Sequence, residues 1–118
     1  MKTILFTCLL LFMYPGKRQI LLFYNDKGAA THNQQMAILD ADKKGLLERD
    51  IVVYAYKTTD EKSVADKWKI KPGEAFVFLL IGKDGGEKIR TDTLVSLAQL
   101  YKTIDAMPMR RTEMQNRK

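Results

Sequence analysis

The single histidine, His32, is the first residue with a side chain suited to chemistry, because imidazole titrates near neutral pH. It follows Asp26 in the stretch NDKGAATH, and the two can be interpreted as an acid–base pair. A lone histidine in an exposed first turn of a helix is more often an ordinary polar residue, and we favour that interpretation. The candidate cleft at this helix start consists of Asn25, Asp26, Lys27, Thr31 and His32.

A second candidate set is basic, and its proposed role is contact with an anion or a partner: Lys88, Arg90, Arg110 and Arg111. The two arginines follow residues 107–109, Met-Pro-Met. We favour an interaction of the pair with the carboxyl end of a helix, whose dipole attracts cations. The alternative is an exposed pair that grips a carboxylate or phosphate of a partner, with the methionines as adaptable apolar contacts.

Thiol and metal chemistry have little support in the sequence. Cys8 is the only cysteine, so no disulfide can form within the chain and no cysteine zinc site can exist. One histidine supplies too few imidazole ligands for a metal site, and no cofactor is predicted. The stretch at 84–86, Asp-Gly-Gly, leads from one strand to the next rather than into a helix, and therefore predicts a hairpin turn instead of a phosphate-binding loop.

Size and charge bound the class of protein. A chain of 118 residues predicts one domain. Twenty Lys and Arg against fourteen Asp and Glu give a formal net charge of +6, which favours anionic partners. The basic residues are spread along the chain, without the interleaved aromatics of a stacking platform, so nucleic-acid binding is not expected. We expect a protein or an anionic surface ligand as the partner.

The amino terminus predicts export. Residues 1–14 carry Lys2 and then an almost wholly apolar run, typical of a secretory signal and too short to span a bilayer alone. The alternative is a buried strand attached to the core. The expected location is the periplasm or the exterior, with or without retention by an uncleaved leader. The remaining chain divides into a domain at 15–109 and a basic polar tail at 110–118.

The first half of the domain predicts two strands joined by a helix. The stretches RQILLFYND and DIVVYAYK are apolar on both faces, as expected of parallel strands covered by helices on two sides. A helix should begin at Thr31, which has the capping-box spacing with Gln34, and should bury Met36, Leu39 and, later, residues 46–47.

The second half predicts a short helix, a hairpin and a closing helix. Residues 60–68 are polar, with a Trp68 that can pack on the sheet. The stretches AFVFLLIG and EKIRT flank the hairpin turn, and a last helix should be capped by Asp92 or Thr93 and ended by Pro108. The order β-α-β-α-β-β-α predicts an α/β fold with a mixed four-stranded sheet flanked by helices, which is the thioredoxin-like core.

Thioredoxin chemistry needs a thiolate at the start of the first helix, where backbone amides lower the thiol pKa. Residues 25–32 contain no cysteine, so thiol catalysis is excluded at that position. The favoured interpretation is a non-catalytic binding module. The alternative is an enzyme that uses the same cleft without a cysteine, through His32 and Asp26; a structural subunit of an envelope assembly is a third hypothesis.

Two stretches, LLIGKDGGEKIR (79–90) and IDAMPMRRTEM (104–114), resemble the signature blocks of the family called domain of unknown function 4174 (DUF4174). RQILLFYND and LLERDIVVYAY are similar to its other segments, so the resemblance covers about residues 17–115. It implies a thioredoxin-like fold, an export signal in many bacterial members, and related domains in secreted sushi-repeat and extracellular-matrix proteins of vertebrates. It implies no catalytic residue.

Overall fold

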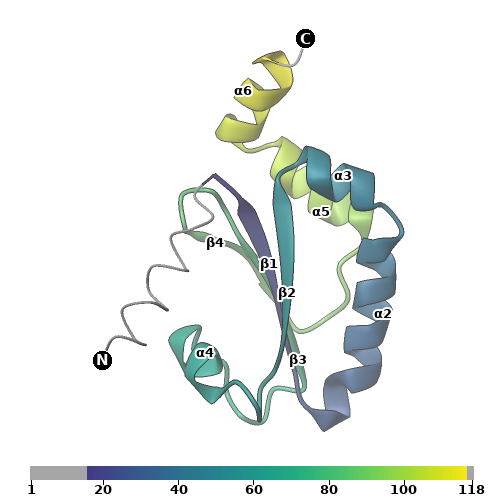
Figure 1. Ribbon diagram of the computed structural model, residues 1–118, viewed down its shortest axis with the longest axis vertical. Helices are drawn as coiled ribbons and strands as arrows, with labels where there is room; N and C mark the ends of the chain where they lie inside the picture. Colours follow the sequence, from purple (N-terminus) through teal and green to yellow (C-terminus); the bar gives the residue numbers. More distant parts are fainter. Residues whose placement is uncertain (1–15, 117–118) are drawn as a thin grey trace.

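The structure, a computed structural model, describes residues 16–116 and contains one mixed sheet of four strands (Figure 1). The strands are β1 (Arg18–Tyr24), β2 (Ile51–Lys57), β3 (Phe76–Ile81) and β4 (Glu87–Thr91). Their spatial order is β2-β1-β3-β4. β1 is parallel to β2 and antiparallel to β3, and β3 and β4 form an antiparallel hairpin. The predicted mixed sheet and its strand order along the chain are confirmed.

Helices cover both faces of this sheet. They are the 3-10 helix η1 (Asp26–Gly28) and the α-helices α2 (Ala29–Asp40), α3 (Lys43–Glu48), α4 (Lys62–Lys67), α5 (Leu97–Asp105) and α6 (Pro108–Asn116). Figure 1 shows α2, α3 and α5 on one side of the sheet and α4 on the other. Within residues 16–116, no helix is long and apolar enough to cross a membrane.

The core has two halves, because side chains alternate between the faces of each strand. Leu22 and Phe78 lie in the cluster beneath α2, α3 and α5, whereas Phe23 and Leu79 lie in the cluster beneath α4. All four are fully buried. Burial of one such side chain contributes about 1.5–3 kcal/mol. Beyond Arg18 and Gln19 at the start of β1, the two central strands therefore consist of apolar residues, which explains the unbroken apolar runs in the sequence.

The first helix differs from the prediction at both ends. α2 begins at Ala29, directly after η1, and not at Thr31. The predicted continuous helix is broken at Asp42, whose side chain accepts a hydrogen bond from the Gly45 amide at 3.1 Å and so starts α3. Leu47 was expected to be buried, but it is 71% exposed because α3 takes a new direction. In a continuous helix the Gly45 amide would donate to a backbone carbonyl, whereas here it donates to the side chain of Asp42.

The carboxyl-terminal part also differs from the prediction. Ser96, and not Asp92 or Thr93, caps α5 with its side chain. Pro108 does not merely follow a finished helix: it is the first residue of α6, a position where the missing N–H costs nothing. Residues 110–116, for which the sequence predicts a basic polar tail, lie within this helix. A polar composition concealed an ordered element.

Candidate functional site

The loop that carries the candidate cleft is held by Asn25. Its Oδ1 accepts hydrogen bonds from the Lys27 amide at 2.9 Å and the Gly28 amide at 3.1 Å, which stabilises η1. Its Nδ2 donates to the Glu74 carbonyl at 3.4 Å and the Pro72 carbonyl at 3.5 Å. The Asn25 side chain therefore links the end of β1 to the segment before β3, and its polar atoms are occupied by this structural role.

Gly28 brings the helix start against that same segment. A Cβ at this position would lie 1.8 Å from the Ala75 carbonyl oxygen, a backbone atom that cannot move aside cheaply. The Asn25 amide also donates to the Ala75 carbonyl at 3.0 Å. The place where a thioredoxin fold carries its catalytic thiol therefore has no space for a side chain at position 28.

The acid–base pair that the sequence suggested is not assembled. The exposed carboxylate of Asp26 pairs with the Lys57 ammonium at 3.0 Å, and this hydrogen bond raises the pKa of Lys57. In the described part of the chain, no hydrogen bond or ion pair joins Asp26 to His32. Lys27 is exposed and Thr31 is half-buried. The five cleft residues share one loop and helix start, but their polar groups do not converge.

His32 is buried and is not an exposed first-turn residue as the sequence suggested. Its ring is 9% exposed and stacks on Tyr24, with centroids 4.0 Å apart and planes 10° apart. Burial lowers the pKa of His32, so the imidazole is neutral at neutral pH. Its Nδ1 is buried and, among residues 16–116, has no hydrogen-bond partner. His32 takes this buried position because α2 packs against the end of β1, where Tyr24 lies.

Arg110 is buried too, which contradicts its role as an exposed anion contact. The residue is 1% exposed, and its guanidinium donates to Asp105 Oδ1 and Glu48 Oε1, each at 3.1 Å. Burial acts to lower the pKa of Arg110, but these two carboxylates outweigh it and the net shift is upward. Arg110 also donates to the Glu48 carbonyl at 3.4 Å, at the carboxyl end of α3. Arg111 remains exposed on α6.

A second buried guanidinium, Arg18, was not anticipated from the sequence. It is 1% exposed, donates to the Arg49 carbonyl at 2.8 Å, and pairs with both carboxylate oxygens of Glu113 at 3.3 Å. The Lys83 ammonium bonds Glu113 at 2.6 Å and Asp50 at 2.9 Å. Hydrophobic periodicity gives no signal for buried charge, so no pattern in the sequence pointed to this network.

Lys88 and Arg90 were predicted to act together, but the hairpin gives them different neighbours. The pairing of β3 with β4 passes from Ile89 to Glu87 and skips Lys88. Lys88 pairs with Asp84 across the hairpin at 2.9 Å. Arg90 donates instead to two carbonyls just beyond the end of α4, those of residues 68 and 69, at 3.1 and 3.0 Å. Of the two residues, Lys88 but not Arg90 lines the pocket that lies between the hairpin and the α5–α6 junction.

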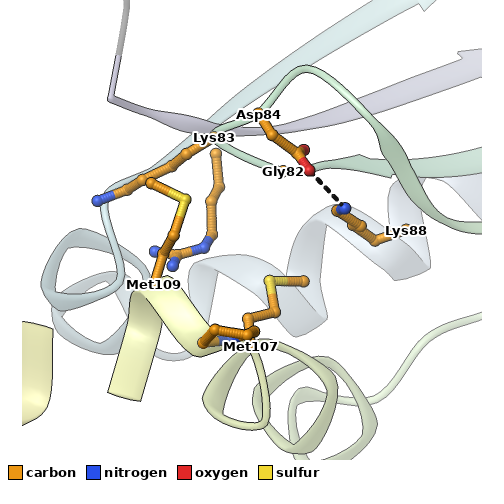
Figure 2. A pocket seen from close by; sticks show the side chains of 8 residues that line it. Gly82, Lys83, Asp84, Lys88, Met107 and Met109 are labelled. Atoms are coloured by element: carbon orange, nitrogen blue, oxygen red, sulfur yellow. Dashed lines mark hydrogen bonds and ion pairs between the residues drawn. The ribbon is translucent and has the colours of Figure 1, made fainter. Parts of the chain in front are cut away.

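That pocket, here called the hairpin pocket, has a volume of about 190 Å³. It is lined by Arg18, by residues 82–84 and Lys88 of the hairpin, and by residues 107–109 at the α5–α6 junction. In Figure 2, Met107 lies below the hairpin side chains, Met109 extends up beside Lys83, and Lys88 is directed at Asp84. The Nε of Arg18 is buried and, in the described part of the chain, has no hydrogen-bond partner. The pocket thus combines apolar walls with cations.

Other ligand chemistry has little support in residues 16–116. They contain no group of three or more His, Cys, Asp or Glu side chains that could hold a metal ion. A second pocket, of about 210 Å³, lies between α4 and residues 58–59 and 70–72. It contains one acidic and one basic side chain, Asp66 and Lys62.

Two solved structures share the fold. One, described as thioredoxin-2, a component of malaria parasite protein secretion machinery, is 19% identical with a TM-score of 0.61 and covers 77% of this chain and 84% of its own. The other, described as a malarial protein, is 17% identical with a TM-score of 0.56 and covers 76% of this chain and 96% of its own. A comparison with curated proteins gave no match. Identities this low show a thioredoxin-like fold and nothing further.

The family is shown by the sequence itself. Residues 10–113 match the model of the family described as domain of unknown function (DUF4174). The match includes the hairpin, the α5–α6 junction and most of α6, the elements that surround the hairpin pocket. With a thioredoxin-like fold and a match over nearly its whole length, this chain belongs to the DUF4174 family.

Proposed function

We propose that this protein is an exported, thiol-free binding module without catalytic activity, whose partner is a protein or an anionic ligand in the cell envelope or outside the cell. One observation carries the proposal: three of the five side chains of the candidate cleft already have partners within the fold. Asn25 ties the loop together, Asp26 pairs with Lys57, and His32 stacks on Tyr24. A catalytic site keeps such groups available to a substrate.

The face around the hairpin pocket supports the binding role. Met109 is 52% exposed at its rim, and Lys88, which lines the same pocket, is exposed as well. Exposed methionine is a common feature of adaptable binding surfaces. Nucleic acid is a less suitable partner, because the buried arginines Arg18 and Arg110 are already paired with carboxylates.

The binding role can be tested by photo-crosslinking in intact cells. A photoreactive residue replaces Met109 in the full chain, and the control replaces Leu47, which is 71% exposed on α3 and outside the pocket. We expect a discrete adduct from position 109 and none from position 47. Equal labelling from the two positions contradicts the proposed binding face, and no adduct from either position rules out a protein partner at this face.

Export rests on the apolar run that follows Lys2 and on a mature domain without cysteine, which needs no protection from oxidation. Residues 1–14 lie outside the described residues. The test is fractionation of cells that express the full chain or its Leu10→Arg variant, which places a charge in the apolar run. We expect the natural chain outside the cytoplasm and the variant inside. Identical cytoplasmic location of both refutes export.

The alternative, an enzyme without a thiol, is favoured by one observation: the neutral imidazole of His32 has a buried Nδ1 without a partner among residues 16–116. A Cys8→Ser chain, which contains no thiol, should show no disulfide-reductase or peroxidase activity. Any activity of the full chain that survives in Cys8→Ser and disappears in His32→Ala would support the enzyme and overturn the binding-module proposal.

A further inference from the structure

We propose that the hairpin pocket binds a single carboxylate group that carries a small apolar substituent. This inference rests on the proposed binding function and names the chemistry of its ligand. The carboxylate belongs either to a short free carboxylic acid or to the last residue of a peptide with an apolar side chain. Both sources present the same group to the pocket.

The first support is a donor that the fold leaves unused. Arg18 lines the pocket and is 1% exposed, so its Nε has no access to bulk water and, among the described residues, no acceptor. Its two terminal nitrogens are already bound to the Arg49 carbonyl and to Glu113. A buried N–H without an acceptor costs about 1–3 kcal/mol. An anion oxygen would remove that cost once a side-chain movement opened the pocket wall to the Nε, which has less than 1 Å² of accessible surface.

The second support is the charge of the lining. Three lining residues are cations, Arg18, Lys83 and Lys88, and one, Asp84, is an anion. The Lys83 ammonium is engaged by Asp50 and Glu113, outside the lining, so it adds little field for a ligand. Lys88 is partly exposed and, among residues 16–116, pairs with Asp84 alone at 2.9 Å, a bond that a ligand carboxylate can share. Arg18 is likewise paired with Glu113, so the three cations are offset by three carboxylates and the lining suits a ligand with one negative charge better than a phosphate with two.

The third support is the shape and polarity of the walls. A volume of about 190 Å³ is smaller than the ~300–1,000 Å³ of pockets that enclose a drug-sized molecule. It therefore has room for one side chain or a short aliphatic group. Met107 and Met109 form one wall, and Figure 2 shows them facing the hairpin across the pocket. The adjacent α6 begins at Pro108, so the positive end of its dipole lies at the same wall.

The test is a nuclear magnetic resonance titration of the full chain with ¹³C-labelled methionine methyl groups. The probes are 3-methylbutanoate and a short peptide that ends in leucine with a free carboxylate. The controls are 3-methylbutanamide and the same peptide with an amidated end. We expect saturable shifts of the Met107 and Met109 methyl signals with the two carboxylates alone. Tighter binding of the peptide identifies a protein carboxyl terminus, and tighter binding of the free acid identifies a small metabolite.

Three variants sharpen the test. Lys88→Gln should weaken binding of 3-methylbutanoate roughly tenfold, the effect of one charged hydrogen bond. Lys44→Gln, which removes an exposed cation of α3 outside the pocket, should leave affinity unchanged. Met109→Ala should weaken 3-methylbutanoate but not acetate. The proposal is overturned if the amides bind equally well, if neither carboxylate gives a saturable shift, or if Lys88→Gln behaves like Lys44→Gln.

The two proposals can fail separately. Discrete crosslinks from position 109 without carboxylate binding would overturn the ligand class and leave the binding module intact. Carboxylate binding without any crosslink in cells would support the pocket as a ligand site and overturn the proposal of a protein partner in the cell envelope.

Discussion

Replacing Glu113 with Gln removes one negative charge from the centre of the ion network and preserves the shape of the side chain. The carboxylate lies 3.3 Å from Arg18, 2.6 Å from Lys83 and 3.7 Å from Arg110. These three cations are between 1% and 10% exposed at their side chains, so water cannot replace the lost partner. The variant therefore leaves buried positive charge with one compensating carboxylate fewer.

The size of the loss follows from the burial. Removal of one partner from a buried ion pair costs about 3–5 kcal/mol. Glu113 is 18% exposed, and Arg18 and Lys83 keep other acceptors, the Arg49 carbonyl and Asp50, which moves the expected loss to about 2–3 kcal/mol. In a domain of this size, that corresponds to a Tm lower by roughly 10–20 °C.

The assay is urea denaturation of the full chain at neutral pH, with Glu87→Gln as the matched control. Glu87 pairs with Arg90 at 3.0 Å, but the two side chains are 40% and 33% exposed, and such a surface pair contributes about 0–1 kcal/mol. We expect a large loss in the free energy of unfolding for Glu113→Gln and almost none for Glu87→Gln. Equal midpoints for the two variants would refute the argument that the network stabilises the fold.

The same variant has a defined pH dependence. Burial acts to raise the pKa of Glu113, but hydrogen bonds from Lys83 and Arg18 outweigh it and the pKa is lowered in the fold. A lowered pKa means that the stabilisation is complete above the unfolded-state pKa, about 4.3, and is lost as the pH falls through the folded-state value. The stability gap between the natural chain and Glu113→Gln should therefore narrow in acid. A constant gap would contradict this assignment.

Two further predictions concern other sites. Gly28→Ala places a Cβ 1.8 Å from the Ala75 carbonyl oxygen and should cost about 1–3 kcal/mol in urea denaturation, whereas Gly73→Ala, with no atom within 4 Å, should change stability by less than about 0.5 kcal/mol; similar losses would argue against close packing at position 28. Burial, followed by the hydrogen bond to Asp42, raises the pKa of Tyr101 to about 12, so an ultraviolet titration should show a tyrosine signal near pH 12 that Tyr101→Phe removes. Because a raised pKa stabilises the fold only below the unfolded-state value, about 10, the contribution of Tyr101 should fade as the pH rises from there towards 12. Loss of an ordinary tyrosine signal in the variant would contradict the shift.

The sheet could be predicted from the sequence because its physical cause is local. β1 and β3 are buried on both faces, so their residues form unbroken apolar runs that no exposed segment resembles. The hairpin turn could also be predicted, because glycine tolerates the positive φ that such a turn needs. In the structure Gly85 has a φ of +83°, a conformation that residues with side chains rarely adopt. Residues 25–32 contain no cysteine, so the sequence alone excludes thiol catalysis at the helix start.

The pocket and the network could not be predicted, because both join segments that are distant in the sequence. α6 has the sequence PMRRTEMQN, with no apolar stripe, and its buried residue is Arg110 rather than a hydrophobe. Charged residues usually indicate a solvated surface, so Arg18 and Arg110 gave the wrong signal. The hairpin pocket needs Arg18, the β3–β4 turn and the α5–α6 junction in one place, and only the fold brings them together.

The ion pairs of Glu113 determine where this chain can be truncated or joined to a fusion partner without loss of stability. The sequence suggested a boundary at residue 109, but a chain shortened there would lose Glu113 and Arg110 and expose the partners that they hold, Arg18 and Asp105. We therefore expect a chain that ends at residue 109 and is joined there to a tag or fusion partner to be poorly soluble. Recombinant versions of this domain should extend past Asn116, where α6 ends.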